Sequence, residues 1–329
     1  MLDLARWLKI NFFLFCLLIF AVLLFSFLGN PVILPSTLFR DPLAHDLFFG
    51  ARLPRVLLAL CVGASLSSSG VVFQSLLRNS LADPYILGVS GGAALGGVIS
   101  LALGLPYPMM SVIAFLFALG TLFLVYFMAQ VGGRLPAQSL LLTGIVFNSF
   151  AFALILLINS LTNMGEIHQI LYLLMGSLEA QELGVVAWLL VFTGIGFAIT
   201  LAYASKMNVV SLGEESASQL GLNVDVLRKI LFFAASLMVG ASVALAGLIG
   251  FVGLFVPHIL RLMIGSDHRL LLPASALGGG IFLIVCDFLA KTAFSGHVFQ
   301  TQIPVGVITA LIGGPFFVFL LKKGDKGRV

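Results

Sequence analysis

The sequence predicts an all-α integral membrane protein of ten transmembrane helices, in which helices 2–5 and 7–10 form an inverted repeat. Two observations predict the fold class. Hydrophobic residues make up 60% of the 329 residues and charged residues 9%, with a mean hydropathy of +1.16, which is too apolar for a water-soluble domain of this size. The apolar runs are also continuous rather than alternating, which disfavours a β-barrel.

Ten apolar runs give the individual helices, because a bilayer core takes about 20 helical residues per crossing. The first run lacks a small-residue cleavage site, so we interpret it as an uncleaved span rather than a signal peptide. The third and eighth runs are short, which predicts helices interrupted by Gly or Pro. No soluble domain separates the runs, so residues 1–329 are predicted to be one transmembrane domain. The runs are 10–29, 53–76, 88–104, 109–130, 139–160, 184–204, 229–249, 251–264, 270–290 and 303–322.

The positions of Lys and Arg predict the orientation, because cytoplasmic loops retain positive charge. With the N-terminus inside, 13 of the 17 basic residues fall at cytoplasmic ends and 4 outside. Both termini and the segment 205–229 are therefore predicted to be cytoplasmic. The inside residues are Arg6, Lys9, Arg78, Arg134, Lys206, Arg228, Lys229, Arg261, Arg269, Lys322, Lys323, Lys326 and Arg328, and the outside residues are Arg40, Arg52, Arg55 and Lys291.

A weak self-similarity suggests the inverted repeat. Gly-Ala-Ser at residues 63–65, followed by Gly70, recurs at 240–242, followed by Gly247, with an offset of 177 residues. These stretches lie five helices apart and would run in opposite directions, as in transporters built around a midplane pathway. A chance match in a chain with 35 glycines is the alternative.

Residues 211–221 form a polar, acidic segment in an otherwise apolar chain. The small residues between its charges predict two short helices joined by a tight turn, open to close approach by a partner. A membrane protein with such a cytoplasmic segment is expected to use it to contact a soluble protein.

Arg52 and Arg55 lie at the outer end of helix two, where positive charge is unexpected. Residues three apart share one side of a helix, and Arg suits bidentate capture of carboxylates, so an acidic external partner is one interpretation. Lys291 could supply a third outer positive charge. The alternative is that these side chains are interfacial anchors that snorkel to the headgroups.

The ionisable residues nearest the membrane interior are Asp287 and His258. For Asp287 we expect an i,i+4 pair with Lys291, and for His258 hydrogen bonding near a helix end, rather than a transport role for either. The sequence contains no phosphate-binding loop, HExxH or GxSxG motif, which argues against an enzyme. The three cysteines lie within spans without ligand-like spacing, so no metal or cofactor is expected. The basic residues are accounted for by inside loops, which gives no reason to expect nucleic acid as a partner.

Several motifs together resemble the ABC-importer permease family for iron chelates, haem and cobalamin. They cover nearly the whole chain in the family's order. The motifs are Ala-Arg-Leu-Pro-Arg at 51–55, the stretch 79–92 (NSLADPYILGVSGG), Gly-Glu-Glu at 213–215 with Leu-Gly at 220–221, the stretch 247–261 (GLIGFVGLFVPHILR) and the stretch 303–310 (IPVGVITA).

The resemblance implies a homodimer in the bacterial inner (cytoplasmic) membrane, with the pathway along the dimer axis and helices five and ten lining it. Two separate ATP-binding subunits would bind inside and a substrate-binding protein outside, where Arg52, Arg55 and Lys291 would dock it. The turn before helix five, Ala137, Gln138 and Ser139, would match the family's inner gate. The residues that would dock the ATPase are Ser211, Leu212, Gly213, Glu214, Glu215, Ala217, Leu220 and Gly221.

The resemblance implies a transport function and leaves the substrate open. Siderophore, haem and cobalamin all remain candidates, because selectivity would reside in the binding protein. Lys291 departs from the family's usual Arg, and Lys cannot form a bidentate fork. The alternative function is an ion-coupled secondary transporter or a channel, which would need intramembrane acids or a cation site.

Overall fold

The computed structural model describes residues 4–29, 31–179, 181–292 and 303–325, so Lys326 and Arg328 of the topology argument lie outside the described residues. Within these ranges the regular structure is helical, with one isolated bridge between Val131 and Arg134. Seven helices are long and apolar enough to cross a membrane, and three shorter apolar helices accompany them. All ten coincide, in order, with the predicted runs. The long helices are α1 (Leu4–Phe27), α3 (Leu53–Leu76), α5 (Tyr107–Ala129), α6 (Ala137–Leu161), α8 (Leu183–Ala202), α11 (Val224–Ala246) and α13 (His268–Thr292), and the shorter ones are α4 (Val89–Ala102), α12 (Val252–Ile264) and α14 (Val305–Asp325).

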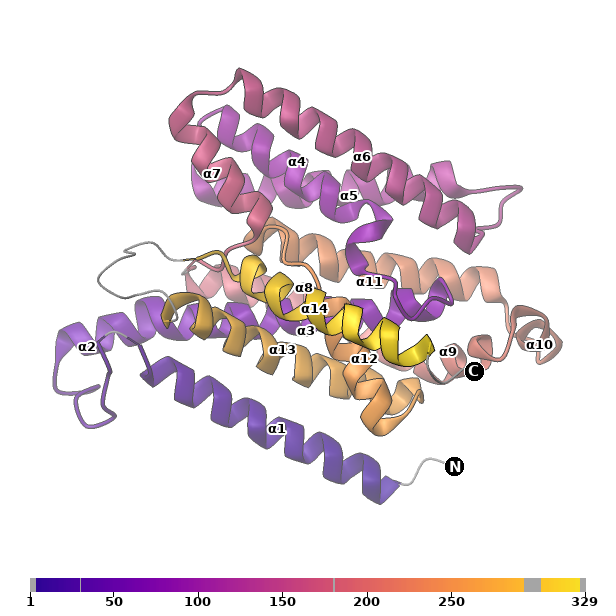
Figure 1. The fold of residues 1–329 in the computed structure, drawn as a ribbon, viewed down its shortest axis with the longest axis horizontal. Helices are drawn as coiled ribbons and strands as arrows, with labels where there is room; N and C mark the ends of the chain where they lie inside the picture. The colour runs from indigo at the N-terminus through magenta and orange to yellow at the C-terminus, as the bar shows by residue number, and fades with distance from the viewer. Residues whose placement is uncertain (1–3, 30, 180, 293–302, 326–329) are drawn as a thin grey trace.

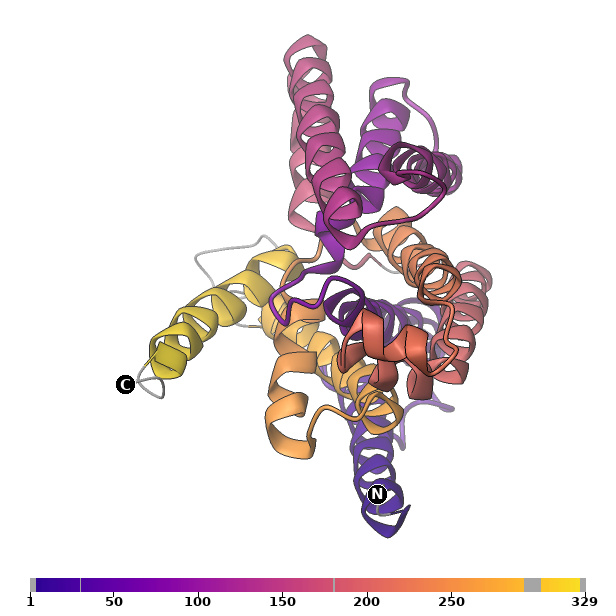
Figure 2. The ribbon, with the colours of Figure 1, turned by 90° about the vertical axis from the view of Figure 1, so that its right-hand side faces the viewer.

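Helices α3 and α11 form the centre of the bundle. In the span that ends with α3, 83% of the most apolar window is buried, and in α11 72%, against 17% in α1 and in α6. Helix α3 packs on α13, α11, α12 and α8, while α1 and α6 lie on opposite outer sides (Figures 1 and 2). The core is therefore built around two buried helices, and the outer helices present apolar side chains to their surroundings, as expected for helices in lipid.

Glycines allow α3 and α13 to touch along their backbones. A Cβ atom at Gly63 would collide with the carbonyl oxygen of Gly279, and a Cβ atom at Gly279 would collide with that of Gly63. Small residues at such crossings permit close helix packing without a hydrophobic driving force. The close approach of α3 and α13 therefore depends on glycine at both positions.

The two predicted helix interruptions meet inside the bundle. The first contains the short helix η2 (Pro84–Leu87), and the second spans residues 247–251 between α11 and α12. The Tyr85 carbonyl accepts hydrogen bonds from Asn148 Nδ2 at 2.6 Å and from Ser90 Oγ at 3.1 Å, and the Ile249 amide donates to the Tyr85 hydroxyl at 2.7 Å. The backbone groups that the interruptions free are thus bonded within the protein, which membrane depth requires.

Some elements were not predicted from the sequence. The second span begins earlier than expected, at Pro42, because α2 (Pro42–Leu47) and the π-helical segment η1 (Phe48–Arg52) continue directly into α3. A further helix, α7 (Met164–Met175), follows α6. By contrast, the two short helices that precede α11, α9 (Ala204–Ser211) and α10 (Glu214–Gln219), were predicted. The start of α1 and the end of α14 lie at the same end of the bundle as α9 and α10 (Figure 1), which we call the α10 end.

Candidate partner-docking site

The polar segment joins two short helices through a tight turn, as predicted, but only α10 lies within residues 211–221. The first, α9, begins at Ala204, earlier than expected, and Ser211 is its last residue. The tight turn to α10 passes through Gly213, whose φ of 131° is unfavourable for residues with a side chain. After α10 the chain turns at Gly221 with φ of 77°. Glycine is therefore required on both sides of α10, and the sequence supplies it.

The predicted docking residues divide into an exposed set and an inward set. Leu212 and Leu220 are 74% and 71% exposed, which is unusual for leucines in a polar segment. Ala217 is fully buried and packs in the core, so it positions α10 rather than offering a contact. We call the exposed set the docking face: Ser211, Leu212, Glu215, Leu220 and Gly221.

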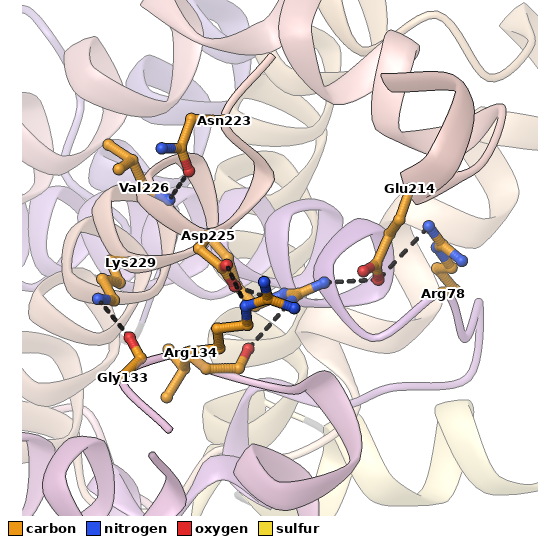
Figure 3. A network of polar contacts seen from close by, with 10 residues as sticks. Arg78, Gly133, Arg134, Glu214, Asn223, Asp225, Val226 and Lys229 are labelled. Carbon is orange, nitrogen blue, oxygen red and sulfur yellow. Dashed lines mark hydrogen bonds and ion pairs between the residues drawn. The ribbon is translucent and has the colours of Figure 1, made fainter. Parts of the chain in front are cut away.

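Glu214 points into the bundle end, unlike the exposed Glu215. Arg228 Nη2 donates to Glu214 Oε1 at 2.6 Å, and Arg78 Nη2 lies 3.5 Å from the same oxygen (Figure 3). The Arg228 side chain is only 5% exposed and the Glu214 side chain 45%, so the ion pair is desolvated on the arginine side alone. The two neighbouring glutamates, which the sequence placed together, therefore have different tasks.

The Arg228 guanidinium also reaches the chain just before α6. Its Nη1 donates to the Leu135 carbonyl at 2.8 Å and lies 3.8 Å from Asp225 Oδ1. Nearby, Lys229 Nζ donates to the Gly133 carbonyl at 3.2 Å (Figure 3). A cleft of about 520 Å³ opens between α10 and this turn, and Arg228 is among the residues that line it.

Helix α9 is fixed to the start of α13 by a second polar cluster. Asn208 Nδ2 donates to Asp267 Oδ1 at 2.7 Å, and Arg269 Nη2 donates to Asp267 Oδ2 at 2.8 Å. Hydrogen bonds from Arg269, together with one from Asn208, lower the pKa of Asp267 to about 2. The carboxylate therefore stays ionised at neutral pH and holds α9 in place.

The residues assigned to the inner gate lie in a helix and not in a turn, which corrects that part of the prediction. Helix α6 begins at Ala137, and Gln138 and Ser139 complete its first turn. Pro136 is the residue before the helix, where its fixed φ and missing N–H suit the helix start. The turn itself lies earlier, where the Val131–Arg134 bridge closes over two glycines with positive φ.

The outer arginines are engaged within the chain. Arg55 donates from Nη2 to Asp287 Oδ1 at 2.8 Å and from Nε to both oxygens at 3.1 Å, and Lys291 Nζ lies 3.2 Å from Asp287 Oδ2. Arg52 donates to the carbonyls of Phe27 and Pro31. The predicted Asp287–Lys291 pair is confirmed. The Arg55 contact was missed because 232 residues separate the partners and no local pattern connects them.

His258 differs from its prediction. It lies inside α12, directly after the helix-internal Pro257, rather than at a helix end. Its Nδ1 is buried, and among the described residues it has no hydrogen-bond partner. The expected helix-end hydrogen bonding is therefore not made at this nitrogen.

Comparison with known proteins places this geometry in a family. The FecCD transport family matches residues 14–323. The chain belongs to that family. It is 45% identical over 281 residues to the cobalamin import system permease protein BtuC of Halobacterium salinarum, covering 83% of this chain and 73% of that one. It is 38% identical over 303 residues to the hemin transport system permease protein HmuU of Yersinia pestis, covering 89% and 88%.

A solved structure supports the same assignment. An ABC transporter described as of metal-chelate type, in an inward-facing conformation, matches with a TM-score of 0.85 and 31% identity, over 96% of this chain and 99% of that one. Membership in the FecCD family makes the chain a multi-pass membrane transport subunit of the ABC-importer permease class. The resemblance identified from the sequence motifs is confirmed.

Proposed function

We propose that this FecCD protein is the transmembrane permease of an ATP-driven importer for an iron chelate (siderophore or haem) or cobalamin. Two copies span the bacterial inner membrane, each with ten crossings. Two ATP-binding subunits dock at the α10 end, and a substrate-binding protein delivers the substrate at the other. The observation that carries the proposal is the docking face: exposed leucines and an exposed glutamate on two short helices. These helices are held against the bundle by the Glu214–Arg228 ion pair and the Asn208–Asp267 hydrogen bond.

The distribution of basic residues and chain termini between the two ends of the bundle supports the proposed orientation in the membrane. The α10 end carries Arg78, Arg134 and Arg228 and both ends of the described chain, so positive charge and termini lie together (Figures 1 and 3). The opposite end carries Arg52 and Lys291. By the positive-inside rule the α10 end faces the cytoplasm, where ATP is available.

Exposed apolar faces on α6 and α14 support a homodimer with the pathway between copies. On α6 Leu142, Val146 and Phe150 are more than half exposed, as is Leu311 on α14. A pocket of about 530 Å³ beside α6 is lined by uncharged residues. Asn148 is one of them, and most of the others are small or apolar. Such a lining lets a bulky chelate pass without tight binding, so the binding protein supplies the selectivity.

The transport mechanism follows from the connections at the α10 end. Closure of the ATPases on binding ATP pushes the docking face, and the permease halves rock against each other. The first turn of α6, with Ala137, Gln138 and Ser139, opens or shuts the inner end of the pathway. The alternative, an ion-coupled transporter or channel, needs an intramembrane acid free to bind a cation. Asp287 is the most buried acid among the residues with described side chains, and it is neutralised by Arg55 and Lys291.

The test is assembly with the ATPase subunit. The tagged permease, expressed with its genomic neighbours and purified in detergent, is expected to bring an ATPase subunit in equal amount, with hydrolysis stimulated by the binding protein. Glu215→Lys should reduce recovery of the ATPase subunit by about tenfold or more. The new lysine either faces a charge of the same sign on the ATPase subunit or has no partner in the contact. Glu182→Lys, an exposed acid at the opposite end, is the matched control. A chain that purifies alone and conducts or exchanges ions would refute the proposal.

A further inference from the structure

We propose that Arg228 is a positioning residue that couples the docking helix α10 to the start of α6, so that the two move as one unit. The inference rests on the proposed function. It assigns a task to a residue that lies outside the docking face and outside the proposed pathway. The sequence analysis identified Arg228 only as one of the basic residues predicted to be cytoplasmic.

The guanidinium bridges two elements that are far apart in the chain. It donates from Nη2 to Glu214 on α10 at 2.6 Å and from Nη1 to the Leu135 carbonyl at 2.8 Å. Arg228 itself belongs to α11, one of the two central helices, and is 4% exposed. A planar fork with fixed donor directions holds both acceptors in one geometry, which a lysine ammonium cannot reproduce.

The choice of partners argues for coupling rather than charge neutralisation. Asp225, one helical turn away on α11, lies within 3.8 Å and could neutralise the guanidinium locally. The two short hydrogen bonds instead go to α10 and to the chain before α6, elements that flank the cleft of about 520 Å³. This one side chain therefore connects the two walls of the cleft directly.

Neighbouring contacts also fix the turn at residues 131–134 to α11, so that it moves together with Arg228. Arg134 Nε lies 3.9 Å from Asp225 Oδ2, and Lys229 donates to the Gly133 carbonyl at 3.2 Å. Leu135 is fully buried, and Pro136, which follows it, is the residue directly before α6. A displacement of α10 thus passes through Glu214, Arg228 and Leu135 to the first turn of α6, the site of the proposed gate.

The experiment uses the complete complex of permease, ATPase subunit and binding protein in liposomes. We compare wild type with Arg228→Lys and Glu214→Gln. Lys9→Gln, which removes an exposed positive charge at the same end of the bundle, is the control. In the first two variants the ATPase subunit should stay bound and hydrolyse ATP, because the docking face is intact. Substrate taken up per ATP should fall by about 5–150-fold, the usual range for energetic coupling between two sites. The control should match wild type.

A distance measurement separates coupling from simple loss of stability. Spin labels at the exposed positions Val131 and Ser218, on either side of the cleft, should keep their separation through the ATP cycle in wild type and lose it in Arg228→Lys. If Arg228→Lys does not fold, Glu214→Gln gives the same readout, since it leaves Arg228 two other partners. Unchanged uptake per ATP, or an unchanged separation in the variants, would overturn the inference while the proposed function stands. A wild-type permease that fails to bind an ATPase subunit would overturn both.

Discussion

Asp287 demonstrates how this chain accommodates a charge away from water. Its side chain is 4% exposed, receives three hydrogen bonds from Arg55 and forms an ion pair with Lys291. A cluster of two cations and one anion therefore lies at the end of the bundle opposite α10. Burying such a cluster costs desolvation energy on all three groups, and removing one partner leaves the others uncompensated. Arg55 and Lys291, which were predicted to dock an acidic partner, are therefore already engaged within the chain.

At the residue scale we predict that Asp287→Asn destabilises the protein strongly, because it leaves Arg55 and Lys291 facing each other without their carboxylate. The expected loss in free energy of unfolding is about 3–5 kcal/mol. Thermal unfolding in detergent would measure it as a lower midpoint. Asp46→Asn, which changes an acid that is 84% exposed at the same end, is the control and should have little effect. Equal midpoints for both variants would contradict the assignment of a structural carboxylate.

At the scale of elements, the crossing of α3 and α13 depends on two glycines in contact. We predict that Gly63→Ala costs about 1–3 kcal/mol, because its methyl group would have to push the Gly279 backbone away. Gly120→Ala on α5, where a Cβ atom meets nothing within 4 Å, is the matched control and should be neutral or slightly stabilising through helix propensity. Chemical or thermal unfolding of the two variants provides the comparison. A Gly63→Ala variant as stable as the control would exclude this packing.

The ten apolar helices could be located from the sequence, because length and continuous hydrophobicity are what a bilayer demands of a crossing segment. Helix α7 was missed because its 12 residues are too few for a crossing. The extension of α3 back to Pro42 was also missed, since the polar residues Arg40 and Asp41 resemble the end of a loop. The inverted repeat stays a prediction. In both halves a long buried helix, an interruption and a short apolar helix follow one another, as α3, η2 and α4 and as α11 and α12.

At the scale of the whole molecule we predict a homodimer in which α6 faces its counterpart. A cysteine introduced at Val146, 64% exposed on α6, should cross-link two copies under mild oxidation in membranes when the native cysteines are replaced. A cysteine at Trp188, which is 66% exposed on α8, is the control and should remain monomeric on a denaturing gel. Cross-linking at Trp188 and not at Val146 would place the dimer interface on the other side of the molecule.

The sequence by itself determined the membrane class, the ten apolar helices, the predicted orientation, the family and the polar segment at 211–221, because each depends on composition, local periodicity or a contiguous motif. Only the tertiary structure decided which of two adjacent glutamates faces outward, that Arg55 is held by Asp287, and that one arginine bridges Glu214 and Leu135. These facts depend on partners separated by 14, 93 and 232 residues. No local pattern encodes such pairings, since they arise only when packing brings distant helices to the same end of the bundle.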